Sequence, residues 1–304
     1  MKKNLPKLIV IAGPTASGKT ALAIKIAEKF GGEIVSADSR QIYKGMNIGT
    51  AKPTPAEMKA VKHHLIDIKN PDEEYTVAEY KKDAVKAICE IIGCGKLPIL
   101  AGGTGLYIKA VTENLDIPSV KPDPVLRKKL EKRIEKEGLA VLYRELIERD
   151  PDAADIIDGK NPRRVIRALE IAILTKKPFS AQRKKREKLF DCLKIGIKLP
   201  AEKLVKRIES RSGLMIKSGL VNEVQELVKK YGEKQIAFDA IGYKEIISHL
   251  GKKISLEEAE SLINKNSAAF AKRQMTWFKK DKETNWVEKK SEAVSLVKNF
   301  LKKN

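Results

Sequence analysis

The chain has 304 residues, of which 42% are hydrophobic and 33% are charged, a balance typical of a globular protein with a buried core. No apolar run reaches the length of a membrane span, and no secretory signal is recognisable, so we expect a cytoplasmic protein. We also expect it to be a monomer. Three cysteines without C-x-x-C spacing argue against a disulfide framework and a zinc site. The net charge of +21 predicts attraction to a polyanion, and nucleic acid is the first candidate. The alternative is that the many lysines only raise the solubility of the protein.

The first predicted strand, residues 8–12, runs directly into a G-x-x-x-x-G-K-T loop and then a helix. Strand, loop and helix in this order form the context of a phosphate-binding loop, in which backbone N–H groups and the helix N-terminus attract an anion. Lys19 would neutralise phosphate charge, and Thr20 would hold Mg²⁺. The alternative is a simple glycine turn with an exposed lysine. The predicted diphosphate-binding residues are Gly13, Pro14, Thr15, Ala16, Ser17, Gly18, Lys19 and Thr20.

Two more predicted strands end in polar or glycine-rich loops. Residues 33–37 lead to Asp38, and residues 97–101 lead to a G-G-T-G loop that contains Thr104. Ligands bind at the carboxyl edge of parallel sheets, where these loops would meet. Asp38 could therefore hold a metal ion, orient a water, act as a general base or simply cap a helix. Thr104 could offer its hydroxyl to a substrate or belong to a plain turn.

The rest of the chain predicts a helical insertion in an α/β core. A helix is expected over residues 76–92 and a short strand over 65–68. Prolines then indicate a linker, and the sequence predicts an all-helical insertion domain over residues 116–192. After it we expect a strand over 193–199, helices over 201–231, 239–250 and 256–279, and an edge strand at 286–287. The predicted fold is a parallel sheet flanked by helices, like that of P-loop NTPases, built from residues 1–115 and 193–304.

Basic residues gather in three places. The runs at 160–167 and 182–188 lie in or at the end of the insertion, and 271–280 mixes cations with aromatic side chains. Such runs often form solvated helix faces, but two of them in a chain of this charge favour a nucleic-acid clamp. Trp277 and Phe278 would either stack on bases or belong to the core.

Several segments match, in order, the motifs of one known family. They are residues 13–20, 36–43 continuing to 49–53, 101–107 and 272–274, with further matches at 161–170 and 240–244. Over nearly its whole length the chain resembles the bacterial tRNA dimethylallyltransferases, also called tRNA isopentenyltransferases, of the IPP transferase family. The second segment is specific to this family, whereas a phosphate-binding loop alone is not.

The resemblance implies transfer of a dimethylallyl group from dimethylallyl diphosphate to N6 of the adenosine 3′-adjacent to the anticodon of tRNA. The phosphate loop would hold the diphosphate leaving group with Mg²⁺, Asp38 would be the general base, and Lys19 and Thr104 would assist catalysis. The adenosine would have to be flipped out of its stack. The implied tRNA contacts, with the insertion gripping the anticodon stem-loop, are Asp38, Ser39, Arg40, Gln41, Thr104, Arg127, Gln182, Arg183, Lys184, Lys185, Arg186, Lys272, Arg273 and Gln274.

Three other functions remain open at this point. A P-loop kinase of a nucleoside or small metabolite would use the insertion as a lid and would transfer phosphate from ATP. An isopentenyltransferase acting on free AMP, ADP or ATP would share the core chemistry but would have less need of two basic runs. A non-enzymatic RNA-binding protein with a relic phosphate loop fits poorly with the complete set of Lys19, Thr20 and Asp38.

Overall fold

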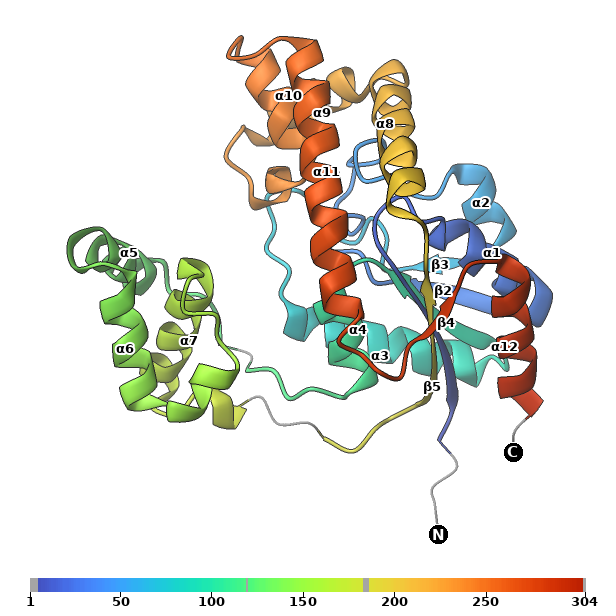
Figure 1. Ribbon diagram of the computed structural model, residues 1–304, viewed down its shortest axis with the longest axis horizontal. Helices are drawn as coiled ribbons and strands as arrows, with labels where there is room; N and C mark the ends of the chain where they lie inside the picture. Colours follow the sequence, from blue (N-terminus) through green and yellow to red (C-terminus); the bar gives the residue numbers. More distant parts are fainter. Residues whose placement is uncertain (1–4, 119, 183–185, 303–304) are drawn as a thin grey trace. The chain divides into compact units, whose positions relative to one another are not determined.

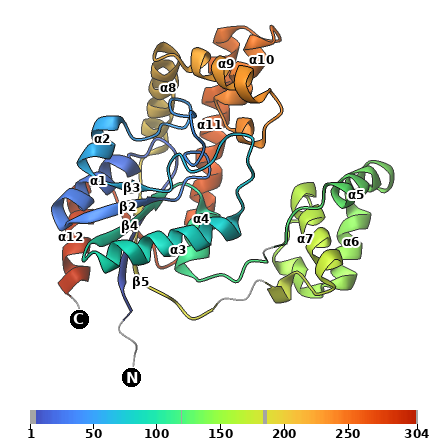
Figure 2. The same cartoon turned by 180° about the vertical axis from the view of Figure 1, so that it is seen from behind.

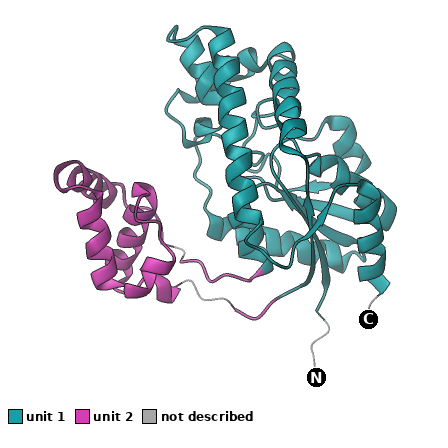
Figure 3. Ribbon diagram, viewed as in Figure 1, with its two compact units in different colours: residues 1–112, 189–304 teal, residues 113–188 magenta. Residues whose placement is uncertain are grey.

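The computed structural model describes residues 5–118, 120–182 and 186–302, and it divides the chain into two compact units. Unit 1 comprises residues 1–112 and 189–304, and unit 2 comprises residues 113–188 (Figure 3). The sequence placed these divisions at 115/116 and 192/193. No helix within the described ranges is both long enough and apolar enough to cross a membrane.

Unit 1 is built on a six-stranded parallel sheet with the strand order β3-β2-β4-β1-β5-β6. The strands are β1 (Lys7–Ala12), β2 (Gly32–Ser36), β3 (His63–His64), β4 (Leu97–Gly102), β5 (Asp191–Ile197) and β6 (Asn285–Val287). β1 lies between β4 and β5, with Ile9 opposite both Ile99 and Leu193. A central parallel strand is covered on both faces, which explains its uninterrupted apolar run.

Alternate side chains of β1 enter two different cores. Leu8 and Val10 pack with α3 (Val77–Gly93) and α4 (Gly105–Thr112) on one face. Ile9 and Ile11 pack with α1 (Lys19–Phe30) and α12 (Lys290–Lys302) on the other face (Figures 1 and 2). The predicted α/β fold with a parallel sheet flanked by helices is therefore confirmed.

Further helices of unit 1 stand beyond the carboxyl edge of the sheet (Figure 1). They are α2 (Pro55–Ala60), α8 (Ala201–Lys217), α9 (Leu220–Tyr231), α10 (Tyr243–Leu250), α11 (Leu256–Phe278) and the short 3₁₀ helix η3 (Ile236–Asp239). A third apolar cluster joins α9, α10 and α11 to Ile42, Tyr43 and Met46 of the long loop after β2. This helical layer therefore covers the loops in which a ligand site was predicted.

Three predicted helices or strands differ from the structure by more than two residues. The helix expected over 201–231 is two helices, because Gly219 adopts a left-handed φ of +97° and breaks it. The helix expected over 239–250 begins only at Tyr243. The strand expected over 65–68 lies at β3 instead, since Leu65 and Asp67 have φ of +62° and +55°, outside the strand region.

Unit 2 consists of helices over its described residues, as the sequence predicts, and contains no strand within those ranges. Its elements are α5 (Pro124–Glu137), α6 (Leu139–Arg149), α7 (Pro162–Thr175) and the short 3₁₀ helices η1 (Pro151–Asp155) and η2 (Ser180–Gln182). Leu130, Leu142, Leu146 and Leu169 are among the residues of its own apolar core. A helical insertion with an independent core is thus present.

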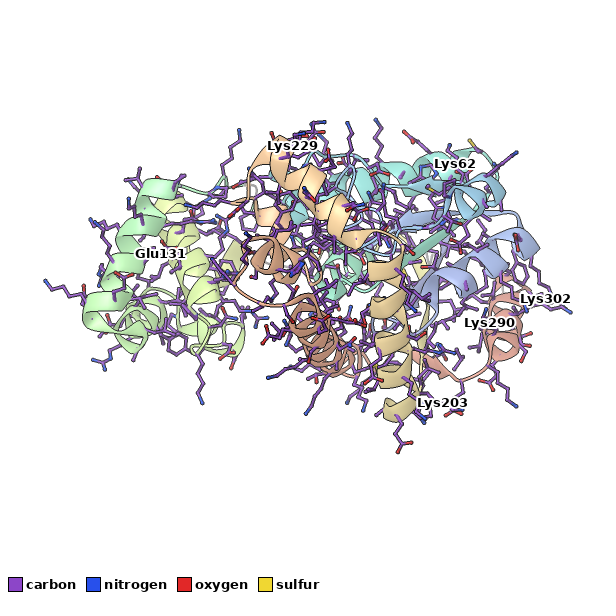
Figure 4. The ribbon with its side chains drawn as sticks, turned by 90° about the horizontal axis from the view of Figure 1, so that it is seen from above. Lys62, Glu131, Lys203, Lys229, Lys290 and Lys302 are labelled. Carbon is purple, nitrogen blue, oxygen red and sulfur yellow. The ribbon has the colours of Figure 1, made fainter. Side chains whose placement is uncertain are left out.

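The positive charge of unit 1 is spread over its surface. Figure 4 labels Lys62, Lys203, Lys229, Lys290 and Lys302 at the periphery of the view, and all five are exposed. Distributed charge of one sign attracts a polyanion from a distance and raises the rate of encounter.

Replacing Gly102 with alanine tests how closely β4 approaches the segment after β2. An added Cβ would lie 2.1 Å from the carbonyl oxygen of Ala37, which belongs to the backbone and cannot move aside. We expect the free energy of unfolding to fall by about 1–3 kcal/mol or more in urea denaturation followed by circular dichroism. The control is Gly93→Ala at the end of α3, where an added Cβ meets open space, and it should change stability by less than about 1 kcal/mol. Equal stability of the two variants would contradict this packing.

Candidate active site

The loop after β1 has the backbone of an anion site. Ala16 and Gly18 adopt left-handed φ values of +61° and +90°, which turns the chain sharply into α1. Gly18 is the N-cap of α1, so no side chain caps that end, and the first turn contains no acidic residue. Its free N–H groups and the helix dipole favour a bound anion. The buried Oγ of Ser17 finds no hydrogen-bond partner among the described residues, as expected for a group that faces a ligand.

Lys19 lies in the first turn of α1 and folds back over this loop. Its Nζ donates a hydrogen bond to the carbonyl oxygen of Pro14 at 2.7 Å. Burial lowers the pKa of Lys19 to about 8, the Asp38 carboxylate opposes that shift, and the Arg211 guanidinium adds to it. The lysine is therefore a cation at neutral pH whose charge is poorly solvated, and an anion in the loop would stabilise it.

Two arginines of α8 face the same loop, and sequence reasoning missed both. The Nη1 atom of Arg207 donates to the carbonyl oxygen of Ser17 at 3.4 Å. One turn later the Nε of Arg211 is buried and has no hydrogen-bond partner within the described part of the chain. Burial lowers the pKa of Arg211, and Asp38 opposes that effect. The R-x-x-x-R spacing on the helix that follows β5 was the only signal available, since residues four apart share a helix face.

Asp38 follows β2 and is fixed by its own loop. Its Oδ1 accepts hydrogen bonds from the N–H groups of Arg40 (2.8 Å) and Gln41 (3.4 Å). This is a turn cap rather than a helix cap, because residues 39–42 form a turn. The other carboxylate oxygen, Oδ2, accepts no hydrogen bond from any described residue. Asp38 therefore combines a fixed orientation with one oxygen that can take a proton.

The predicted residues Arg40 and Gln41 have partners within the protein. Arg40 donates through Nη1 to the carbonyl oxygens of Ile236 and Ala237 at 2.9 and 3.3 Å. The amide oxygen of Gln41 accepts from Ser36 Oγ at 3.1 Å, and its Nε2 donates to two carbonyls of the same loop. Both side chains thus stabilise the conformation of residues 38–41, here called the Asp38 segment. Their contacts with tRNA stay predictions.

Thr104 connects the G-G-T-G loop to the Asp38 segment. Its Oγ1 accepts from the N–H of Ser39 at 3.0 Å and lies 3.3 Å from Ser39 Oγ, while its own N–H donates to the Ala37 carbonyl at 3.0 Å. The structure therefore brings Thr104 next to Asp38, as the topology of a parallel sheet predicts.

Gln274 of α11 joins the phosphate loop to the G-G-T-G loop. Its Oε1 accepts from the N–H of Thr15 at 2.8 Å, and its Nε2 donates to the carbonyl of Gly103 at 2.8 Å. With 7% of its surface exposed, the side chain is an internal bridge. A contact between Gln274 and tRNA stays a prediction.

Neighbouring residues of α11 are divided between surface and core. Lys272 and Arg273 are exposed, and the Arg273 guanidinium lies 5.8 Å from the ring centroid of Phe270. Phe278 is buried in the core, so of the two roles that the sequence allowed, base stacking or core packing, it has the second. Trp277 is 39% exposed and packs against Gly105, where an added Cβ would lie 2.2 Å from its ring.

Unit 2 contains the remaining predicted tRNA contacts. Arg127 forms two hydrogen bonds, of 2.9 and 3.0 Å, with the fully buried carboxylate of Glu170. The amide of Gln182 donates to Thr175 Oγ1 at 2.8 Å, and Arg186 pairs with Asp116 at 2.9 Å. Arg183, Lys184 and Lys185 lie outside the described residues. The described side chains thus have intramolecular partners, and their contacts with RNA stay predictions.

Comparison with known proteins identifies a family for these features. The model of the IPP transferase family matches residues 41–281. A tRNA dimethylallyltransferase of Acetivibrio thermocellus is 48% identical over 94% of this chain and 92% of its own, and one of Geobacter sulfurreducens is 44% identical over 93% and 92%.

Solved structures agree with these sequence matches. The full-length tRNA isopentenylpyrophosphate transferase of Bacillus halodurans matches with a TM-score of 0.72 at 38% identity, covering 97% of this chain and 95% of its own. A eukaryotic dimethylallyltransferase acting on tRNA matches with a TM-score of 0.80 at 27% identity, covering 97% of this chain and 79% of its own.

The pKa of Lys19 can be measured directly from the ¹³Cε resonances of labelled lysines as a function of pH. The resonance absent from a Lys19→Arg protein should have its midpoint near 8, so that its protonated fraction falls as the pH rises through this value. Asp38→Asn should lower the midpoint further, because it removes the carboxylate that stabilises the cation. Arg211→Gln should raise it, because it removes a like charge. A midpoint near 10.5 that neither variant moves would contradict this electrostatic arrangement.

Proposed function

The chain belongs to the IPP transferase family, and on that basis we propose that it is a tRNA dimethylallyltransferase. It transfers a dimethylallyl group from dimethylallyl diphosphate to N6 of the adenosine 3′-adjacent to the anticodon, giving N6-dimethylallyladenosine and diphosphate. One observation supports this assignment most strongly. A phosphate loop, its cations and the Asp38 carboxylate, of which one oxygen accepts no hydrogen bond from a described residue, lie together at one edge of the sheet. The chain that contains them is 48% identical to a tRNA dimethylallyltransferase.

The donor diphosphate binds in the loop formed by residues 13–20. Backbone N–H groups at the start of α1, the Lys19 ammonium and the guanidinium groups of Arg207 and Arg211 surround this position. As the allylic C–O bond breaks, negative charge grows on the departing diphosphate. Groups already oriented toward that charge stabilise the transition state more than the ground state.

Mg²⁺ is the proposed metal ion, and the residues present fit it. The described residues contain no group of three or more His, Cys, Asp or Glu side chains that could hold a metal ion by themselves. Mg²⁺ commonly binds through one or two protein groups together with phosphate oxygens and waters. The hydroxyl of Thr20, in the first turn of α1, is the protein ligand expected here. The ion would neutralise part of the charge on the diphosphate.

Asp38 is the proposed general base. An adenine amine is a weak nucleophile until its proton can leave. As the bond between N6 and the allylic carbon forms and the C–O bond breaks, the N6 proton passes to Oδ2 of Asp38, while two N–H groups hold Oδ1 in place. Thr104 fixes the backbone of Ser39 beside it, so the base and the acceptor adenine keep one geometry.

The acceptor is an adenosine within tRNA. A stacked base cannot reach a site at the edge of the sheet, so the nucleotide is flipped out toward Asp38. The positive charge distributed over unit 1 attracts the phosphate backbone. Unit 2 grips the anticodon stem-loop, and the exposed Lys272 and Arg273 contact the RNA near the site. The protein works as a monomer in the cytoplasm.

The activity is tested with purified protein, Mg²⁺, dimethylallyl diphosphate and unmodified tRNA, followed by digestion and mass spectrometry of the nucleosides. Dimethylallyl-adenosine should form with tRNA and not with free AMP. Parallel reactions with ATP and without the prenyl donor test for phosphate transfer. Product formed only with AMP would assign the protein to free-nucleotide chemistry, and ATP consumption without prenylation would indicate a kinase.

The Asp38→Asn variant separates a general base from a metal ligand. Loss of a general base should lower kcat on tRNA by about 10²- to 10⁴-fold. Affinity for diphosphate in the presence of Mg²⁺, measured by calorimetry, should be unchanged or tighter, because a negative charge near Lys19 and Arg211 is removed. Asp72→Asn, at an exposed position of unit 1, is the matched control and should leave both quantities unchanged. Weaker diphosphate binding in Asp38→Asn would show instead that Asp38 holds the metal.

A further inference from the structure

Two family segments, residues 49–53 and 240–244, take no part in the chemistry above, yet the structure brings them together. They meet at Glu223, in the first turn of α9. The ring of Tyr243 lies so close to Gly49 that a Cβ there would be 2.5 Å from Tyr243 Cε2. A side chain larger than that of glycine at position 49 would therefore collide with this ring.

The carboxylate of Glu223 is surrounded by donors. Its Oε2 accepts from the N–H groups of Asn47 (3.0 Å) and Ile48 (2.8 Å), and its Oε1 accepts from the N–H of Gly49 (3.2 Å). Tyr243 completes the set, its hydroxyl donating to Oε1 at 2.6 Å. Three successive N–H groups around one anion form a nest, in which a charged acceptor binds more strongly than a neutral one. Burial and the neighbouring Glu223 raise the pKa of Tyr243 well above its usual value, so it remains a donor.

The loop fixed in this way supports the Asp38 segment. The carbonyl oxygens of Thr50 and Ala51, directly after the nest, accept from Nε2 of Gln41 at 3.4 and 3.2 Å. The N–H of Gln41 donates in turn to Asp38 Oδ1. A second connection starts at Lys52, whose Nζ donates to the Tyr43 carbonyl at 2.6 Å. The Glu223 nest is thus linked to the carboxylate of Asp38 by hydrogen bonds that are joined through covalent segments of one loop.

The donor site depends on other supports. Thr15 is held by Gln274 of α11, and Ser17 and Pro14 are contacted by Arg207 and Lys19. None of these contacts passes through α9 or through residues 47–53. A change at Glu223 should therefore displace the general base and leave the diphosphate site intact.

We propose that Glu223 and Tyr243 are positioning residues for the acceptor half of the reaction. They set the loop over residues 41–53 and, through Gln41, the orientation of the Asp38 carboxylate, while neither forms a hydrogen bond with residues 13–20 or with Asp38. The inference rests on the proposed function, since it assigns these residues to the transfer of the prenyl group onto tRNA.

The Glu223→Gln variant keeps the size of the side chain but replaces one acceptor oxygen with an amide NH2 group, a donor that faces backbone N–H donors. A displacement of about 1 Å at the reacting groups can cost 10²-fold in rate, so kcat on tRNA should fall by about 10- to 100-fold. The Kd for diphosphate should stay within about two-fold, because its supports are separate. Glu226→Gln, an exposed change of the same charge on the same helix, is the control and should leave both values unchanged.

The Tyr243→Phe variant keeps the ring against Gly49 and removes one hydrogen bond. It should lower kcat in the same direction by about 3- to 10-fold, less than the full strength of one hydrogen bond to a charged group, because three backbone N–H groups still hold the carboxylate. If Glu223→Gln fails to fold, the kcat of Tyr243→Phe tests the same positioning role. Because both side chains act through one carboxylate, the double variant should lose less than the product of the single losses.

Hydrogen exchange provides a readout that does not depend on activity. In Glu223→Gln the amides of residues 38–41 and 47–49 should exchange faster than in the parent protein, and those of 13–20 should not change. Normal kcat in folded Glu223→Gln, or loss of diphosphate binding in proportion to kcat, would overturn the proposal. A parent protein that makes no dimethylallyl-adenosine would instead refute the proposed function, and the exchange pattern would still report on the loop.

Discussion

The site depends on keeping a carboxylate and two cations close together without letting them form an ion pair. Asp38 opposes the loss of positive charge at both Lys19 and Arg211, so the three groups interact electrostatically. Backbone hydrogen bonds nevertheless keep them apart, because Asp38 is held by the amides of its own turn and Lys19 by the carbonyl of Pro14. In the proposed reaction, a direct ion pair would occupy both the positive charge assigned to the diphosphate and the oxygen assigned to the N6 proton. The separation leaves each group available for its proposed role.

The fold maintains that separation through the topology of the sheet. The strands β1, β2 and β4 are neighbours and run in one direction, so their loops lie at one edge. Single side chains then tie the loops in pairs: Thr104 ties the loop after β4 to the loop after β2, and Gln274 ties it to the phosphate loop. Each tie is a short hydrogen bond to a backbone group, which fixes a loop more firmly than a contact between two mobile side chains would.

What could be predicted from sequence depended on how far apart the relevant residues lie. The first strand, the glycine loop after it and the place of Asp38 at the end of β2 are local patterns, and the structure has all three where the sequence predicts them. Arg207 and Arg211 were missed because nothing within α8 indicates which face turns toward Ser17, a contact between residues 190 positions apart. Gln274 was assigned to RNA from its motif, while its two hydrogen bonds to the loops depend on how α11 packs. The strand expected at 65–68 failed because left-handed backbone at Leu65 and Asp67 is not visible in an apolar run.

In the proposed reaction the phosphate loop holds the leaving group while the free oxygen of Asp38 faces the nucleophile. The most direct measurement is a crystal structure of the protein with an anticodon stem-loop RNA and an unreactive thio-analogue of dimethylallyl diphosphate. We predict the diphosphate within the loop of residues 13–20, in contact with Lys19 and Arg211, and the flipped adenine with N6 about 2.6–3.2 Å from Asp38 Oδ2. A diphosphate bound elsewhere, or an N6 that faces a proton acceptor other than Asp38, would contradict this arrangement.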